Sequence, residues 1–138
     1  MNQAVAAVRH PFADLLGFRI VGRGDGGCRA ELDVRDDHFN PHGLVHGAVL
    51  YALADTSMGG ALTSVLSPQE LCTTIEIKIN YFRPWRSGVL ACDTRIVYRG
   101  RTTATLTSDL TDGEGRHLAQ ATGTFAIQPR PTAASAQP

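Results

Sequence analysis

One long stretch of this chain carries almost no charge. Between His38 and Gln69 there is no lysine, arginine or glutamate, and the only acid is Asp55. From about His46 onward the stretch is Ala, Leu, Val and Gly at almost every position, which predicts a long helix, near residues 46–64, that is buried on all sides. Such a helix must be wrapped by the rest of the chain, so it constrains the fold more than any other element.

Asp55 is therefore expected where carboxylates are rare. Burying an unpaired carboxylate costs several kcal/mol, and no basic residue lies three or four positions away to offset that cost. A capping or helix-dipole role would be the ordinary explanation. Asp55 follows the expected helix start by about nine residues, however, well beyond the first turn where those roles apply. We interpret Asp55 as a functional carboxylate, because perturbed buried acids cluster at active sites.

Length and charge narrow the class of protein. The 138 residues suffice for one domain with a sizeable core. The 13 basic and 13 acidic residues balance, which argues against a nucleic-acid partner or an anionic membrane surface. No apolar run reaches membrane-spanning length, and the N-terminal apolar run is too short for a signal peptide. We therefore expect a soluble, cytoplasmic protein.

The cysteines and the C-terminal composition bear on cofactors and domain limits. Cys28, Cys72 and Cys92 are odd in number and have no zinc-ligand spacing, so a reducing compartment suits them and neither a metal nor a cofactor is expected. From residue 129 the sequence PRPTAASAQP has little to bury. We expect one domain over residues 1–128 and a disordered tail over residues 129–138.

Residue periodicity predicts strands on both sides of the helix. A short helix is expected within residues 4–16, with Pro11 in its first turn or dividing it. Alternating apolar and polar residues, separated by short Gly-containing turns, predict six strands joined largely as antiparallel hairpins. The expected strands are residues 18–21, 28–35, 75–82, 89–98, 102–111 and 117–127.

The order of two strands, one apolar helix and four strands predicts an α+β fold. The antiparallel sheet is the only material able to cover the helix, so the sheet should curl around it. One curved sheet leaves part of the helix and a sheet edge uncovered, which favours a dimer.

A spaced set of residues runs through the expected loop, helix and following strand. The set reads Asn40-x-x-Gly43-x-x-His46-Gly47, then Asp55 eight residues later, then Tyr81-x-x-Pro84. This pattern resembles the hotdog-fold acyl-CoA thioesterases, in particular the phenylacetate-pathway type, which includes the mammalian thioesterase superfamily member 2 proteins. The resemblance covers about residues 12–127. It implies a curved antiparallel sheet wrapped around one long central helix, and hydrolysis of an acyl-CoA to a free acid and CoA.

The resemblance also implies a role for individual residues. Asp55 matches the catalytic carboxylate, as nucleophile or general base, and Gly47 matches the residue whose amide polarises the thioester carbonyl. Asn40 matches a polar residue that orients water or substrate, Thr74 a hydroxyl residue that holds the water, and His46 a histidine of less settled role. Ordinary structural roles remain alternatives for these residues. They are helix-start flexibility for Gly47, a turn residue for Asn40, a strand residue for Thr74, and a helix cap or a satisfied interior histidine for His46.

The spacing of two of these residues bears on the assembly. Gly47 and Asp55 are eight positions apart, about 12 Å along a helix axis, so one thioester carbon cannot easily meet both within one chain. A two-fold axis could bring Gly47 of one copy to Asp55 of another and form two equivalent sites at a homodimer interface. The resemblance implies the same arrangement, with a homotetramer of two dimers as the larger assembly.

CoA carries phosphates that need cations or polar groups. The resemblance implies that residues after the Tyr-x-x-Pro strand and in the following hairpin turn contact the nucleotide. The expected contacts are Tyr81, Arg86, Arg99, Gly100, Arg101 and Thr102. Solvated charge at strand ends is the alternative for these arginines.

Some features depart from the family pattern, and other functions compete. Ala48 stands where many relatives carry a second glycine, which would narrow the acyl pocket, and Thr74 adds a methyl group to the serine of some relatives. Enoyl-CoA hydratases of this fold need an acid where this chain has Asn40. A non-catalytic acyl-CoA-binding domain is the alternative that stays open, and the acyl group, aromatic or medium-chain, is not determined.

Overall fold

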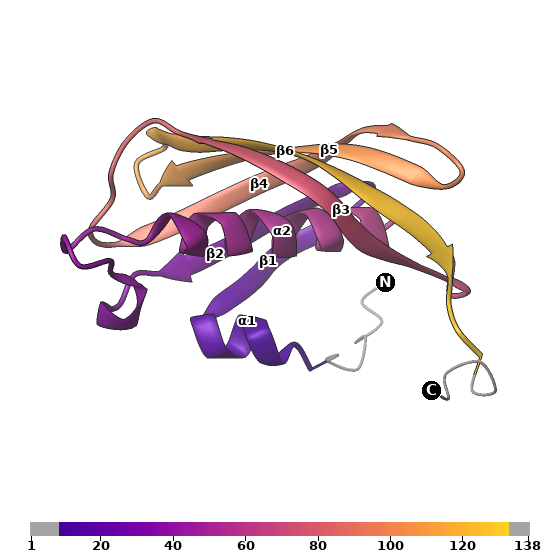
Figure 1. Ribbon diagram of the computed structural model, residues 1–138, viewed down its shortest axis with the longest axis horizontal. Helices are drawn as coiled ribbons and strands as arrows, with labels where there is room; N and C mark the ends of the chain where they lie inside the picture. The colour runs from indigo at the N-terminus through magenta and orange to yellow at the C-terminus, as the bar shows by residue number, and fades with distance from the viewer. Residues whose placement is uncertain (1–8, 133–138) are drawn as a thin grey trace.

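The computed structural model describes residues 9–132, which form one long helix, two short helical segments and six strands (Figure 1). The elements are α1 (Pro11–Leu16), β1 (Phe18–Gly24), β2 (Gly27–Asp33), the 3-10 helix η1 (Asp36–His38), α2 (Gly47–Thr63), β3 (Glu70–Tyr81), β4 (Val89–Arg99), β5 (Thr103–Asp112) and β6 (His117–Pro129). The expected α+β class and the long helix are confirmed.

The six strands make a single sheet in the order β1-β2-β4-β5-β6-β3. Every neighbouring pair is antiparallel. The sheet curls over one side of α2, which runs along its concave face (Figure 1). This is the hotdog architecture that the sequence predicts. The strands β1 and β3 form its two edges.

Apolar side chains of α2 fill the concave side of the sheet. Leu53, Met58 and Leu62 are fully buried among sheet residues such as Leu32 and Leu106. Each such side chain contributes about 1.5–3 kcal/mol by leaving water. The helix is therefore held mainly by packing, in agreement with its apolar composition.

A chain of buried hydroxyl groups also ties α2 to the sheet. The Ser57 hydroxyl donates to the Cys28 carbonyl at 3.2 Å, and the Thr94 hydroxyl donates to Ser57 at 2.8 Å. Ser108 lies 2.6 Å from the Thr94 hydroxyl. Because buried hydroxyls need partners, these contacts favour one rotation of α2 about its axis. Asp55, two positions from Ser57, is thereby directed away from the core.

One face of α2 is open, so the expectation of a helix buried on all sides is wrong for the single chain. Tyr51 is 37% exposed, and Asp55, Thr56, Gly59 and Thr63 are partly or fully accessible. Composition alone does not reveal this open face, because its residues are mostly small or aromatic and of types that also occur in protein cores. The uncovered helix surface agrees with the reasoning that favours a dimer.

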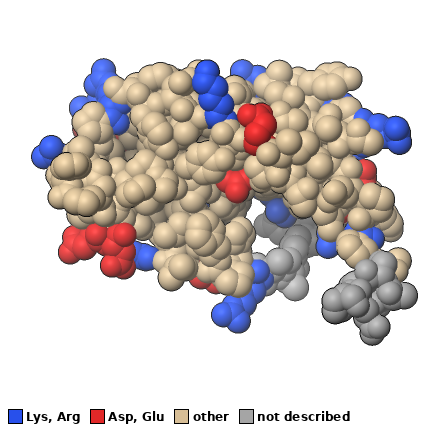
Figure 2. All heavy atoms as spheres, viewed as in Figure 1, with Lys and Arg blue, Asp and Glu red and all other residues tan. Residues whose placement is uncertain are grey.

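The charged side chains on the visible surface reflect the equal numbers of acidic and basic residues. Acidic and basic side chains lie mainly toward the rim of the face in Figure 2, and neither sign forms an extended patch there. Within residues 9–132, no helix is long and apolar enough to cross a membrane.

Several element limits differ from the sequence expectations. The first helix begins at Pro11, where proline occupies the first helical position and the His10 side chain caps the helix; residues 1–8 lie outside the described part. The strand β3 begins at Glu70, before the expected limit, because it pairs along its length with β6. The strand β6 reaches Pro129, and the Arg130 N–H donates to the Gln69 carbonyl. The rest of the expected tail, residues 133–138, lies outside the described residues.

Candidate active site

Asp55 lies on the open face of α2 and is held by Thr74. The Thr74 hydroxyl donates to Asp55 Oδ1 at 2.7 Å. Asp55 is half-buried rather than enclosed, which corrects the expectation of a fully buried carboxylate. Among the hydrogen bonds of residues 9–132, none uses Asp55 Oδ2, so this oxygen is available to water or a ligand. The sequence suggested both residues, and the structure brings them together.

A bulge in β3 places Thr74 beside the helix. The register between β3 and β6 shifts between Thr74 and Glu76, so the intervening Ile75 is an extra residue and is 56% exposed. Side chains alternate along a strand, and one extra residue reverses the alternation. Thr74 can therefore face α2 although Ile77, an odd number of positions away, also packs against the core. The expected uninterrupted alternation from Ile75 is wrong for this reason.

Asp55 opens into a hollow of about 380 Å³, called here the carboxylate hollow. Its walls come from α2, β1, β3, β6 and the N-terminal segment, and include Phe12, Ile20, Gly59, Cys72, Thr74 and Phe125. Burial raises the pKa of the Cys72 thiol, and the nearby Asp55 charge adds to this effect. Cys72 therefore stays a neutral thiol.

The N-terminus of α2 carries a free backbone donor. His46 is the N-cap, and its Nδ1 accepts from the Ala48 N–H at 2.9 Å. Since Nδ1 accepts, the neutral imidazole carries its proton on Nε2. Gly47 is the first helical residue, and no acceptor among the described residues takes its N–H. His46 thus acts as the cap that was its ordinary alternative, while the Gly47 amide remains available to a ligand.

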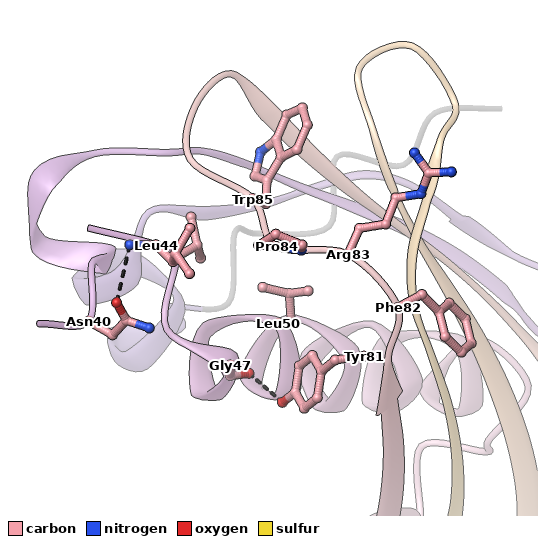
Figure 3. Close-up of a pocket in the computed structure, with 10 residues that line it drawn as sticks. Asn40, Leu44, Gly47, Leu50, Tyr81, Phe82, Arg83, Pro84 and Trp85 are labelled. Atoms are coloured by element: carbon pink, nitrogen blue, oxygen red, sulfur yellow. Dashed lines mark hydrogen bonds between the residues drawn. The ribbon is translucent and has the colours of Figure 1, made fainter. Parts of the chain in front are cut away.

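Tyr81 holds the Gly47 peptide. The Tyr81 hydroxyl donates to the Gly47 carbonyl at 2.6 Å (Figure 3). A Cβ atom on Gly47 would lie 3.0 Å from Tyr81 Cζ, tighter than ordinary contact, so glycine permits this approach. Burial, with a smaller effect from Tyr51, raises the pKa of the Tyr81 phenol, which keeps it a donor at neutral pH. Tyr81 was expected to contact CoA, and the structure gives it this backbone partner.

Asn40 shapes the loop before α2. Its Oδ1 accepts from the N–H groups of His42 at 2.9 Å and Leu44 at 3.1 Å, one of which is drawn in Figure 3. This is the turn role that the sequence left as an alternative. Among the described residues no hydrogen bond uses its Nδ2, so the amide group can still serve a ligand.

Asn40, Gly47 and Tyr81 share a second hollow, of about 280 Å³ (Figure 3). We call it the glycine pocket. Its remaining walls are mostly apolar and include Leu44, Leu50, Phe82, Pro84 and Trp85. The glycine pocket and the carboxylate hollow share no lining residue. One chain therefore holds the free amide and the carboxylate in separate places, as their spacing along the helix predicts.

The expected CoA contacts divide between the two ends of β3. Arg99 pairs with Glu70 at 3.3 Å, where β3 begins, whereas Tyr81 is the last residue of β3, about 36 Å away at 3.3 Å per residue. Arg101 and Thr102 are exposed in the same turn as Arg99 and Gly100, and Arg86 is exposed near the glycine pocket. Within one chain, Tyr81 therefore lies far from Arg99 and Arg101, although the sequence groups all three as expected CoA contacts.

Two residues that shape the glycine pocket were not singled out from the sequence. Buried His38 accepts the Arg35 N–H through Nδ1 and donates through Nε2 to the Leu16 carbonyl, at 3.0 and 2.7 Å, which anchors the loop that carries Asn40. The Trp85 carbonyl accepts from the Val45 N–H at 2.8 Å on the other side of that loop. The single tryptophan, directly after the Tyr-x-x-Pro motif, was the available signal.

No group of three or more metal-ligating side chains occurs within residues 9–132. The polar groups that line the two hollows include the Asp55 carboxylate, the Thr74 hydroxyl, the Asn40 amide and the free Gly47 N–H. Together they can orient a carbonyl group and supply a carboxylate for attack on its carbon.

Comparison with known proteins supplies the family. The sequence model of the thioesterase superfamily matches residues 42–119, which include Gly47, Asp55 and Tyr81. A candidate esterase of Pseudomonas aeruginosa, PA1618, is 30% identical over 132 residues, which cover 94% of this chain and 90% of that protein. A 1,4-dihydroxy-2-naphthoyl-CoA hydrolase of Listeria monocytogenes is 23% identical over 115 residues, 83% of this chain and 94% of that protein.

A solved structure is similar along most of the chain. A variant of the phenylacetic acid degradation protein PaaI from Thermus thermophilus has 30% identity and a TM-score of 0.78, covering 85% of this chain and 98% of that one.

Proposed function

The chain belongs to the thioesterase superfamily and is a thioester hydrolase, and we propose that its substrate is an acyl-CoA, cleaved to a free acid and CoA. The CoA ester hydrolase among its relatives supports this class of substrate. The observation that carries the proposal is Asp55, the one acid of a helix stretch without other charges, held by Thr74 in an open hollow. The acyl group is aromatic or of medium chain length.

The Gly47 amide polarises the thioester carbonyl. Hydrolysis develops negative charge on the carbonyl oxygen, and a free N–H at a helix N-terminus offers a hydrogen bond and a favourable dipole. Tyr81 keeps the Gly47 peptide in position through the 2.6 Å hydrogen bond to its carbonyl. Asn40, on the same pocket wall, orients water or substrate with its free amide group.

Asp55 supplies the negative charge for attack on the carbonyl carbon. As the base it takes a proton from water, whose oxygen bonds to the carbonyl carbon. As the nucleophile its own oxygen forms a mixed anhydride with the acyl group, which water then hydrolyses to release the acid and restore the carboxylate. The bond between the carbonyl carbon and sulfur breaks, and the proton from water passes to the CoA thiolate. Thr74 fixes Oδ1 at 2.7 Å and leaves Oδ2 for this step.

The complete site lies between two subunits. Gly47 and Asp55 occupy separate hollows in one chain, so a homodimer supplies the free amide from one subunit and the carboxylate from the other. Two such dimers form the tetramer. Arg86 beside the glycine pocket, and Arg99, Gly100, Arg101 and Thr102 on the carboxylate side, contact CoA in this arrangement. The free cysteines suit a reducing cytoplasm.

The test is thiol release from a panel of aromatic and aliphatic acyl-CoAs by wild type and Asp55→Asn. Asparagine keeps the shape of the side chain and the acceptor for Thr74 but removes the charge. We expect kcat/KM to fall at least about a hundredfold in the variant, with the dimer intact by light scattering and an unchanged melting temperature. A wild-type protein that binds acyl-CoAs without releasing thiol would instead be a non-catalytic acyl-CoA-binding domain.

A further inference from the structure

Two adjacent glycines in α2 have different surroundings. A Cβ atom on Gly60 would lie 2.9 Å from Cys28 Sγ, so glycine is required there for α2 to approach β2. A Cβ atom on Gly59 would meet no atom within 4 Å. Both positions are inside the helix, where glycine is less favourable than alanine. Packing within the chain explains Gly60 and leaves Gly59 without a structural reason.

Gly59 lines the carboxylate hollow together with Asp55. The two residues are four positions apart, so they lie on one face of α2, about 6 Å apart along its axis. An acyl chain whose carbonyl carbon lies beside Asp55, and which runs along the helix, reaches Gly59 after a few bonds. The space over Gly59 is therefore continuous with the place where the thioester carbonyl must lie.

The walls around this space are suited to an apolar group. Phe12 and Ile20 from the N-terminal part of the chain and Phe125 from β6 line the same hollow. Phe12 and Ile20 are 51% and 44% exposed although both are large and apolar. Such side chains lower their free energy by covering an apolar ligand. The hollow is also lined by polar and charged residues, among them His10 and Arg23.

We propose that Gly59 determines acyl specificity: the missing side chain makes room for the part of an apolar acyl group beyond its first carbons, between α2 and the Phe12–Ile20 wall. The inference rests on the proposed thioesterase function. In the proposed homodimer the partner supplies its free amide beside Asp55, and we assign the acyl group to the space over Gly59 because that space belongs to the same hollow as the carboxylate.

The test replaces Gly59 by alanine and by leucine, with Gly60→Ala as the matched control. Thiol release is measured with acetyl-CoA, hexanoyl-CoA and decanoyl-CoA, alongside melting temperature and dimer mass. We expect Gly59→Leu to lower kcat/KM for decanoyl-CoA about tenfold or more and to change that for acetyl-CoA less than about threefold. Gly59→Ala should raise the melting temperature by about 3 °C, whereas Gly60→Ala should lower it through its contact with Cys28.

Two outcomes would overturn the inference. Equal losses for all three esters, with dissociation of the dimer, would assign the space over Gly59 to a partner subunit. Unchanged kinetics for every ester in Gly59→Leu would show that no acyl group reaches this position.

Binding separates a failure of this inference from a failure of the proposed function. Titration calorimetry of decanoyl-CoA and acetyl-CoA is repeated with Asp55→Asn and with Asp55→Asn combined with Gly59→Leu. Weaker binding of decanoyl-CoA alone in the double variant supports the role of Gly59 even if the wild-type protein releases no thiol. Equal affinities in the two variants contradict it.

Discussion

The glycine pocket and the carboxylate hollow lie along the same helix but are built in different ways. In the glycine pocket the functional atom is a backbone N–H, and the Tyr81 side chain of β3, the Asn40 side chain and the Trp85 carbonyl hold the backbone around it. In the carboxylate hollow the functional atom is on a side chain held by one hydroxyl. The backbone N–H belongs to no side chain, so its position depends on the residues around it. The carboxylate is supplied by a single side chain, so its function depends mainly on residue 55 being an acid.

Removing the backbone donor should have the largest effect. Gly47→Pro deletes the N–H but keeps a residue favoured at the first helical position, and we expect a loss of about 10²–10³ in kcat. Gly47→Ala is the control, because it adds the same Cβ atom near Tyr81 but keeps the N–H. Equal activities of the two variants would remove the amide from the mechanism.

The same variant tests whether the two hollows act across subunits. Mixing Gly47→Pro and Asp55→Asn proteins, unfolded and refolded together, should restore about a quarter of wild-type activity, because each heterodimer would hold one intact site. Activity of the mixture no higher than the mean of the two separate proteins would mean that both residues act within one chain.

The hydroxyl that supports the carboxylate should matter less than the amide. Thr74→Val keeps the shape of the side chain and removes the donor to Asp55 Oδ1, and we expect about a tenfold lower kcat, since hydrogen bonds to charged groups contribute about 1.5–3 kcal/mol. Thr74→Ser retains the hydroxyl and should keep most of the activity. Steady-state kinetics on one acyl-CoA compares the three proteins.

Tyr81 should act on the glycine pocket through position alone. Tyr81→Phe removes the hydrogen bond to the Gly47 carbonyl, and we expect kcat to fall about fivefold with little change in KM. Burial raises the Tyr81 pKa, so this contact is complete below the ordinary tyrosine pKa and is lost as pH rises through the raised value. Wild-type kcat should therefore decline at alkaline pH, and the phenylalanine variant should lack that decline.

The buried hydroxyls behind α2 hold the helix that carries both hollows. Changing them should lower the stability of the protein without a selective effect on either hollow. Thr94→Val removes the partner of Ser57 and Ser108 in the core. We expect the free energy of unfolding, measured in urea, to fall by about 1–3 kcal/mol. Activity per folded molecule should stay near that of wild type, and a selective loss of turnover would contradict this role.

Much of the fold follows from sequence period alone. The helix, expected near residues 46–64, spans Gly47–Thr63, and the strands appear in the expected order. The sheet edges and the uncovered face of the helix also agree with that reasoning. The spacing of apolar residues reflects which face of a helix or strand is buried, so these elements can be predicted from the sequence alone.

The parts of the candidate site that could not be predicted depend on contacts distant in sequence. The extra residue at Ile75 turns Thr74 toward Asp55, and no local pattern marks that bulge. Tyr81 reaches the Gly47 carbonyl from the far end of a strand thirty-four positions along the chain. The contrast between Gly59 and Gly60 likewise exists only because β2 passes behind one of them.

The sequence by itself determined that one acid lies on a long uncharged helix, eight residues beyond a glycine at its start. The uncharged helix and the spacing of its acid from its first glycine follow from composition and residue order, so they would be the same in any fold that buries the helix. Only the tertiary structure decided which face of α2 stays open and which side chains meet the acid and the glycine. Those choices depend on strand register and on the rotation of α2, which arise from packing between segments far apart in the chain.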